Sequence, residues 1–198
     1  TEREGLVDEA VAEELQRRQP AFLNTIPTHH TPNGACLSAS RRRRLVELCH
    51  RYGVMVIADE VYHLLSYTAP APLPVAGLIE TGTVLSLGSF SKILAPGLRL
   101  GWLQAGPDVI QRFFTCGLLD SGGGLNPFTS GVVRSAIELG LLERNVEHLK
   151  AVYSRRMSAM IVALRLHLPE GVDFLESSGG FFFWLTLPDT ADVREIQG

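Results

Sequence analysis

Apolar residues along the chain recur with two alternating periods, one typical of helices and the other of strands. Residues 5–18 have apolar side chains at helical spacing, which predicts an amphipathic helix. The continuous apolar run at residues 54–58 is rich in β-branched residues and predicts a strand covered on both faces. Further helices are expected at residues 38–52 (capped by Ser38 or Ser40), 107–116, 128–142 and 145–168, and further strands at residues 21–26, 83–87, 98–104, 172–176 and 180–187.

The order of these elements predicts an α/β fold. Up to about residue 140, strands alternate with helices, which favours a mainly parallel central sheet. The long helix and the Gly179-Gly180 hairpin after it are typical of a small α+β domain. We therefore expect residues 1–144 to form the end of a large domain and residues 145–198 to begin a small one. The chain lacks an initiating methionine and its last residues resemble the start of a helix, so we expect a piece of a longer protein.

Composition excludes several classes of protein. The chain has 198 residues, of which 45% are hydrophobic and 20% charged, and its formal net charge is −3, which gives no general attraction for nucleic acid. Its apolar runs are far too short to span a membrane. Three widely separated cysteines suggest neither a disulfide framework nor a metal site, and indicate a reducing compartment such as the cytoplasm. The basic run at residues 41–44 is expected to be a solvated helix face, and the aromatic run at residues 181–184 to be strand core.

Polar side chains follow the predicted strands at the edge where open α/β sheets bind ligands. Beyond the loop at residues 27–34, these side chains are Asp59, Tyr62, Ser89, Ser91, Lys92 and Arg99. Taken singly, each has an ordinary structural explanation: the aspartate could cap a turn, the tyrosine could be half-buried, and the serines could form turns. Together they supply an acid, a phenol, two hydroxyls, an amine and a guanidinium for one ligand.

Lys92 is the most informative of these residues. Only two of the 18 basic residues are lysines, Lys92 and Lys150. A lysine directly after a buried strand, among apolar neighbours, would be desolvated, which frees its amine to form a Schiff base with an aldehyde. The alternative is a surface lysine at a helix start, where its charge would oppose the helix dipole.

The motifs resemble those of class I/II aminotransferases, the fold-type I pyridoxal-phosphate enzymes. Residues 89–102, Ser-Phe-Ser-Lys-Ile-Leu-Ala-Pro-Gly-Leu-Arg-Leu-Gly-Trp, resemble that family's lysine motif. Residues 59–62, Asp-Glu-Val-Tyr, are similar to its pyridine-binding segment. Residues 26–34 resemble its Asn-Pro-x-Gly loop, and residues 178–184 its small-domain hairpin. The resemblance covers essentially the whole chain in the family's order.

The resemblance implies a role for each site residue. Lys92 would carry pyridoxal 5'-phosphate as a Schiff base and then move the α-proton of the substrate. Asp59 would keep the pyridine nitrogen protonated, and Tyr62 would hydrogen-bond the phenolic oxygen of the cofactor. The phosphate would be bound by Ser89, Ser91 and Arg99.

The resemblance also implies substrates and a partner. The protein would move an amino group between an amino acid and a 2-oxo acid, as a homodimer in its full-length form. Residues 122–127, Gly-Gly-Gly-Leu-Asn-Pro, look like the family segment near the dimer interface, although a flexible glycine loop is the alternative. Neither nucleic acid nor membrane is expected as a partner.

One position departs from the family pattern. The family's Asn-Pro-x-Gly loop reads Thr31-Pro-Asn-Gly in this chain, so that Thr31 replaces the asparagine that contacts the phenolic oxygen. Asn33 is shifted by two residues and could serve only the turn. We expect Thr31 to contact the cofactor. Because its hydroxyl is shorter than the asparagine amide, we expect either altered electronics of the cofactor ring or weaker binding of the cofactor.

Three other functions share parts of this pattern. An aminotransferase-like effector domain of a transcription regulator would contain a similar Thr-Pro-x-His loop and a winged-helix domain upstream. A carbon–sulfur lyase on the same fold would reuse the same cofactor residues. A serine hydrolase could use Ser89-x-x-Lys92, but the Lys-Thr-Gly and Ser-Asp-Asn motifs that should accompany it do not occur.

Overall fold

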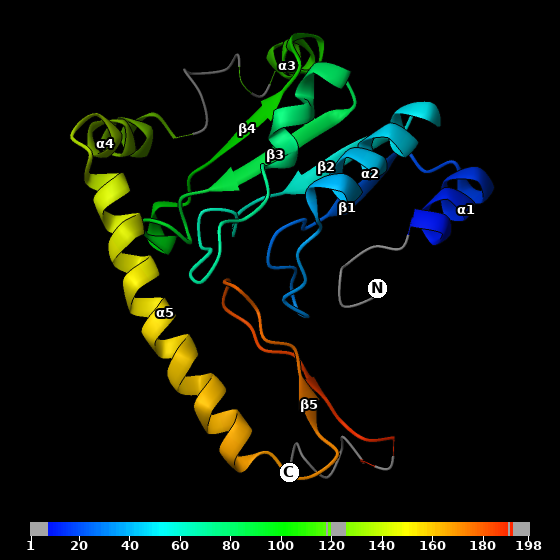
Figure 1. Ribbon diagram of the computed structural model, residues 1–198. Helices are drawn as coiled ribbons and strands as arrows, with labels where there is room; N and C mark the ends of the chain where they lie inside the picture. Colours follow the sequence, from blue (N-terminus) through cyan, green and yellow to red (C-terminus); the bar gives the residue numbers. More distant parts are fainter. Residues whose placement is uncertain (1–7, 118, 120–125, 190, 192–198) are drawn as a thin grey trace.

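A computed structural model describes residues 8–117, 119, 126–189 and 191. A four-stranded sheet lies beside helices, and one long helix leads away from it to a two-stranded hairpin (Figure 1). The α-helices are α1 (Asp8–Arg18), α2 (Ala39–Arg51), α3 (Pro107–Phe114), α4 (Pro127–Glu138) and α5 (Leu141–His167), and the 3-10 helices are η1 (Val75–Thr81) and η2 (Pro96–Leu98). The strands are β1 (Phe22–Thr25), β2 (Met55–Asp59), β3 (Val84–Ser89), β4 (Gly101–Ala105), β5 (Asp173–Phe174) and β6 (Leu185–Thr186).

The central sheet confirms the predicted α/β class. Its strand order is β1-β2-β3-β4, and β1, β2 and β3 are parallel to one another. β4 pairs antiparallel with β3, with Ser89 opposite Gly101. The connection between these two residues is too short for the crossover that a parallel strand needs, so β4 can only return alongside β3.

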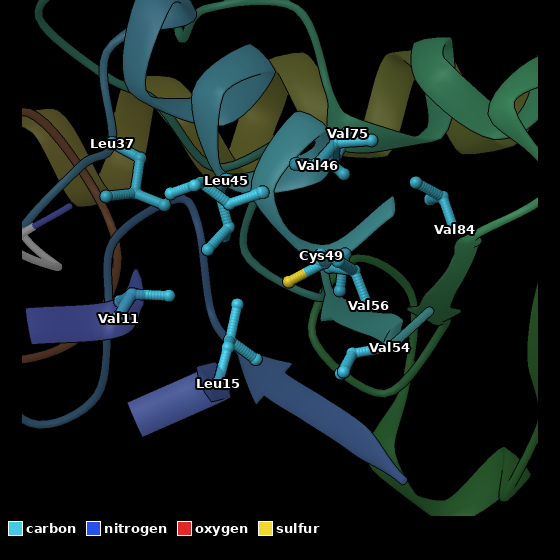
Figure 2. Close-up of a cluster of buried hydrophobic side chains, with 12 residues drawn as sticks. Val11, Leu15, Leu37, Leu45, Val46, Cys49, Val54, Val56, Val75 and Val84 are labelled. Carbon is cyan, nitrogen blue, oxygen red and sulfur yellow. The ribbon is translucent and has the colours of Figure 1, made fainter. Parts of the chain in front are cut away.

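A hydrophobic core joins α1 and α2 to β1 and β2 (Figure 2). Leu15 of α1 and Leu45 and Cys49 of α2 are buried in it, facing Val56 of β2. Val54, Val56 and Ala58 are buried, whereas the alternate positions of this strand are half-buried. The predicted run is therefore a central strand, but only one of its faces is fully covered.

The long helix begins earlier than expected. α5 starts at Leu141 after Gly140, which adopts a left-handed conformation with φ 64°. The boundary that we expect after residue 144 consequently falls inside the first turns of this helix. Asn145 ties these turns to the sheet domain, since its Nδ2 donates to the carbonyl oxygen of Ile93 at 2.8 Å.

The second lobe differs from the predicted hairpin. Only β5 and β6 are paired, so the expected strands at residues 172–176 and 180–187 are mostly not strand. The expectation that residues 181–184 are strand core is wrong: Phe181, Phe182 and Trp184 are 37%, 43% and 46% exposed and lie outside any strand. The cause is the preceding segment, which crosses to the sheet domain and pairs there, with Ser66 bridged to Gly179.

Some expectations fall outside the described residues. These are the first turn of the helix at residues 5–18, the glycine loop at residues 122–125 and the helix start at residues 192–198. Across the described ranges, no helix is long and apolar enough to cross a membrane.

Candidate active site

The amine of Lys92 lies beside a pair of aromatic rings. Lys92 follows the end of β3 and is half-buried. Its Nζ is 6.0 Å from the ring centroid of Tyr62 and 5.9 Å from that of Phe181. The Tyr62 and Phe181 rings are 5.6 Å apart and nearly perpendicular, at 76°. Ring faces attract a cation at this range, so a protonated Lys92 amine would interact with both rings at the sheet edge.

Two hydroxyls and a guanidinium gather beside this lysine. Ser89 Oγ accepts the backbone N–H of Ser91 at 3.2 Å, which orders the turn after β3. Arg99 has a left-handed backbone, with φ 49°, and its Nη1 lies 3.4 Å from both Ser91 Oγ and the carbonyl oxygen of Pro96. Because Arg99 is exposed, its remaining N–H groups can reach an anion. Serine hydroxyls next to a guanidinium suit a phosphate.

Asp59 ends β2, the parallel neighbour of β3, and Thr31 follows β1, the next strand in the sheet. Asp59 ends β2 in register with Leu87 of β3, and its Oδ1 accepts the backbone N–H of Val61 at 3.4 Å. The turn-capping contact expected of this aspartate is therefore present, and its side chain remains half-buried at the same sheet edge. Thr31 lies in the loop after β1. Since β1, β2 and β3 are parallel, the side chains that come at the carboxyl end of each of these strands belong to one edge of the sheet.

Thr31 carries a buried polar atom that has no partner. Its Oγ1 is shielded from solvent and makes no hydrogen bond to any residue in the described ranges. Asn33 does serve the turn, because its Oδ1 accepts the N–H of Ala35 at 3.1 Å and lies 3.0 Å from His30 Nδ1. Buried hydroxyls are normally hydrogen-bonded, so the free Thr31 hydroxyl fits a contact with a bound molecule.

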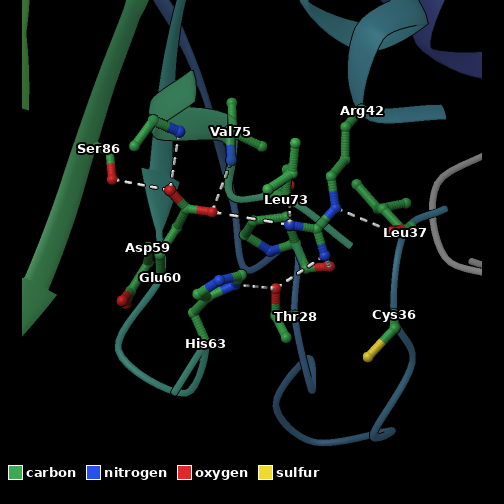
Figure 3. Close-up of polar contacts among 12 residues, drawn as sticks. Thr28, Cys36, Leu37, Arg42, Asp59, Glu60, His63, Leu73, Val75 and Ser86 are labelled. Carbon is green, nitrogen blue, oxygen red and sulfur yellow. Dashed lines mark hydrogen bonds and ion pairs between the residues drawn. The ribbon is translucent and has the colours of Figure 1, made fainter. Parts of the chain in front are cut away.

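A buried ionic network behind the site was missed by the sequence analysis (Figure 3). The basic run at residues 41–44 is not uniformly solvated: Arg42 is 1% exposed, and the solvated-face prediction is wrong for this residue. Arg42 Nη1 lies 3.7 Å from Glu60 Oε1. Glu60 also accepts the N–H of Val75 at 2.8 Å and the Ser86 hydroxyl at 2.8 Å.

Arg42 also binds the loop that carries Thr31. Its guanidinium donates to the carbonyl oxygens of Pro27 and Leu37, both at 2.9 Å, and to Thr28 Oγ1 at 2.8 Å. Burial lowers the pKa of Arg42, while the charge of Glu60 opposes this effect. The network therefore ties the start of α2, the loop after β1 and the residue next to Asp59 into one unit.

The helical register could have revealed Arg42. It lies three residues before Leu45 and four before Val46, both buried, and thus on the core face of α2. A charge at that position requires a buried partner, and Glu60, adjacent to the predicted site aspartate, was the available acid.

Comparison with known proteins identifies the family. The model of the family described as aminotransferase class I and II matches residues 7–196. The chain belongs to this family. The class I/II resemblance of the motifs is thereby confirmed, and so is the α/β architecture.

Individual members of the aminotransferase family match along nearly the whole chain. This chain is 33% identical over 192 residues to aromatic-amino-acid aminotransferase 1 of Thermococcus litoralis. The alignment covers 96% of this chain and 45% of that protein. The structure of kynurenine aminotransferase from Pyrococcus horikoshii superposes with a TM-score of 0.89 at 32% identity, covering 98% of this chain and 49% of that one. An uncharacterised HTH-type transcriptional regulator of Bacillus subtilis, YdfD, is 30% identical over 98% of this chain and 40% of its own length. The chain spans about half the length of the curated relatives that it matches.

Proposed function

We propose that the protein containing this chain is a pyridoxal-phosphate-dependent aminotransferase, which moves an amino group between an amino acid and a 2-oxo acid. The observation that carries the proposal is the amine of Lys92, which lies about equally far from the Tyr62 and Phe181 rings at the carboxyl end of β3. Family membership supports the same cofactor and reaction class.

The donor set of this chain fits the cofactor. Its anionic phosphate would be held by two hydroxyls and a guanidinium, those of Ser89, Ser91 and Arg99. Its pyridine ring nitrogen would be paired with the carboxylate of Asp59, and its phenolic oxygen with Tyr62. The unpartnered hydroxyl of Thr31 supports the assignment of a further contact to the phenolic oxygen, in place of the family's asparagine.

The proposed chemistry divides between cofactor and protein. When bound, the cofactor supplies an electron sink for the negative charge that develops at the substrate Cα. Lys92 would bind the cofactor aldehyde through Nζ, and after release would take the α-proton onto Nζ and return it. The Asp59 carboxylate would hold a proton on the ring nitrogen by charge pairing. The aromatic walls formed by Tyr62 and Phe181 would exclude water from the amine.

Borohydride reduction of the cofactor-loaded, full-length protein, followed by peptide mapping, tests this proposal. We expect the pyridoxyl group on Lys92, retained in Lys150→Arg and lost in Lys92→Arg. Lys150 is the matched control because it pairs with Glu147 on α5, where Nζ and Oε1 are 3.2 Å apart. A label elsewhere, or none, would contradict the proposal.

Turnover separates an enzyme from a ligand sensor. The named relatives act on aromatic amino acids and kynurenine, so these are the first donors to test. Release of a 2-oxo acid from the amino acid, matched by amination of an added 2-oxo acid, is the expected result. Cofactor bound at Lys92 without either product would instead support the regulator, and cleavage of a carbon–sulfur bond would support the lyase.

Three further assignments belong to this proposal. Residues 1–144 would form the end of the large cofactor-binding domain, and residues 145–198 would begin the small domain. The full-length protein would be a homodimer, for which the exposed apolar side chains of α4 are the support, since Phe128 is 84% and Val132 47% exposed. A cytoplasmic location is supported by the three cysteines, all of which are free thiols.

A further inference from the structure

His29 is a buried side chain that the proposed chemistry does not use. It is 2% exposed and lies in the loop after β1, two residues before Thr31. Its backbone is left-handed, with φ 51°. A non-glycine residue in this region is strained and persists only where its surroundings fix it. The contacts of the ring therefore must outweigh this strain.

The His29 ring joins three separate segments of the chain. Its Nε2 lies 2.8 Å from Ser66 Oγ in the loop after β2. Its Nδ1 lies 3.3 Å from Cys36 Sγ and 3.4 Å from Ser177 Oγ, the latter in the second lobe. Burial lowers the pKa of His29 to about 4, and the nearby His63 and Arg42 add to this effect. The ring is consequently neutral near pH 7, with one nitrogen that donates and one that accepts.

The second lobe is packed directly onto this ring. A Cβ at Gly179 would overlap the His29 ring and the carbonyl oxygen of Leu65, and Gly180 has φ 74° and lies against the His29 Cβ. Glycine is thus the residue that permits this close approach. The Gly180 N–H donates to the carbonyl oxygen of Leu65 at 3.0 Å, and the Tyr67 N–H donates to that of Ser178 at 2.8 Å.

Gly179 and Gly180, packed against His29, form the junction between the second lobe and the sheet domain. The next residue, Phe181, reaches the candidate active site. Its ring contacts Tyr62 and lies 5.9 Å from Lys92 Nζ. The Phe181 ring also packs against Tyr153 of α5, at 5.1 Å between centroids. Any shift of residues 177–180 relative to His29 would therefore move one of the two aromatic walls beside the amine.

We propose that His29 is a positioning residue: its ring holds residues 177–180 of the second lobe against the sheet domain, and so sets Phe181 in place beside Lys92. The catalytic part of this inference rests on the proposed aminotransferase activity. In the described hydrogen bonds, the His29 ring contacts none of the residues assigned to the cofactor, so it acts through the segment that it holds.

Four variants of the full-length protein test the inference. His29→Leu removes all three polar contacts of the ring, whereas His29→Gln keeps an amide nitrogen near the position of Nε2. Ser66→Ala deletes one partner of the ring without altering the buried loop, in case His29→Leu does not fold. Ser158→Ala is the matched control, because its hydroxyl bonds only to the carbonyl oxygen of Ser154 on exposed α5 in the described contacts.

Amide hydrogen exchange is the first measurement, and it does not depend on activity. Loss of one buried hydrogen bond should speed exchange at the Tyr67 and Gly180 amides about tenfold in His29→Leu and Ser66→Ala. Exchange in β2 and β3 should not change, and His29→Gln should restore most of the protection. Unchanged exchange at these two amides would overturn the inference.

Kinetics is the second measurement. We expect kcat to fall about tenfold in His29→Leu and Ser66→Ala, with unchanged affinity for pyridoxal phosphate, because the phosphate-binding hydroxyls lie outside the altered junction. Equal losses of cofactor affinity and kcat would indicate a merely structural role and overturn the positioning claim. Failure of the wild-type protein to carry the cofactor on Lys92 would instead contradict the proposed function, while the exchange measurement would still decide the role of His29.

Discussion

Arg42 shows how much a single buried charge can depend on its neighbours. Its guanidinium reaches three backbone carbonyl oxygens, one threonine hydroxyl and the carboxylate of Glu60. Both side chains are almost completely buried, so neither charge has water to replace a lost partner. Removing one member of such a pair costs far more than the net stability of the pair itself.

Arg42→Ala should therefore destabilise the protein by about 3–5 kcal/mol, measured as the free energy of unfolding in urea. Arg44→Ala is the control: its Nη1 lies 4.0 Å from Glu47, both side chains are exposed, and the expected loss is below about 1 kcal/mol. Adding Glu60→Gln to Arg42→Ala should cost less than the sum of the two single changes. Equal losses for Arg42→Ala and Arg44→Ala would show that the pair is not buried in solution.

Thr31 gives a test of the residue that departs from the family pattern. Thr31→Asn restores the longer amide side chain, which can reach a phenolic oxygen that the threonine hydroxyl approaches less closely. We expect the dissociation constant for pyridoxal phosphate to fall about tenfold, on the order of one additional hydrogen bond. Equilibrium dialysis measures it, with Asn33→Ser as a control in the turn. An unchanged constant would place Thr31 outside the cofactor site.

The placement of the candidate site residues was easier to predict from the sequence than that of the residues that support them. Lys92 and Tyr62 lie close together as expected, because residues that follow adjacent parallel strands meet at the same edge of the sheet. Arg42 and His29 were not predicted in their roles, since each depends on partners far away in sequence. Glu60 and Ser177 are such partners, and local periodicity carries no information about them.

The secondary structure elements followed the apolar period closely where they are long. α2 runs over 13 residues and begins after Ser38, whose hydroxyl accepts the Arg41 N–H at 3.3 Å, as a capping serine should. The antiparallel direction of β4 and the 3-10 helix η1 were not predicted. The direction of a strand relative to its neighbour depends on the length of the connection between them, which the apolar period does not show. The 3-10 helix η1 has too few residues to show a helical period.

Gly88 and Gly131 should respond in opposite ways to an added methyl group. A Cβ at Gly88 would overlap the ring of Trp102 on β4, whereas a Cβ at Gly131 in α4 would meet nothing within 4 Å. Gly88→Ala should therefore cost about 1–3 kcal/mol by overpacking. Gly131→Ala should gain about 0.5–1 kcal/mol, because alanine loses less backbone entropy in a helix.

Thermal unfolding of both variants measures the difference. Trp102→Leu provides a further check, since it should make Gly88→Ala less costly by clearing the space that the ring occupies. A loss for Gly88→Ala that is the same with and without the ring would contradict the packing described for β3 and β4.

The molecule as a whole has an apolar surface on α4 that its own described residues leave uncovered. Phe128 projects from the first turn of this helix at 84% exposure. In the homodimer that we propose for the full-length protein, Phe128→Asp should shift the equilibrium toward monomer, because a carboxylate cannot be buried there without a partner. Sedimentation velocity measures the shift, and Arg134→Asp on the same helix, where Arg134 pairs with Glu138, controls for added negative charge. A dimer unaffected by Phe128→Asp would place the interface elsewhere.

The length of α5 would amplify any tilt of this helix, as a lever does. Its fixed point is Asn145, bonded to the backbone beside Lys92, and its far end is Arg165, paired with Glu176 of the second lobe at 3.0 Å. At 1.5 Å per residue these points are about 30 Å apart, so a tilt of about 5° displaces the far end by about 2.5 Å. A tilt of α5 that is too small to break the Asn145 hydrogen bond would thus move the Arg165 end of the helix by a distance comparable to the size of a side chain. The second lobe, which is paired with that end, would move with it.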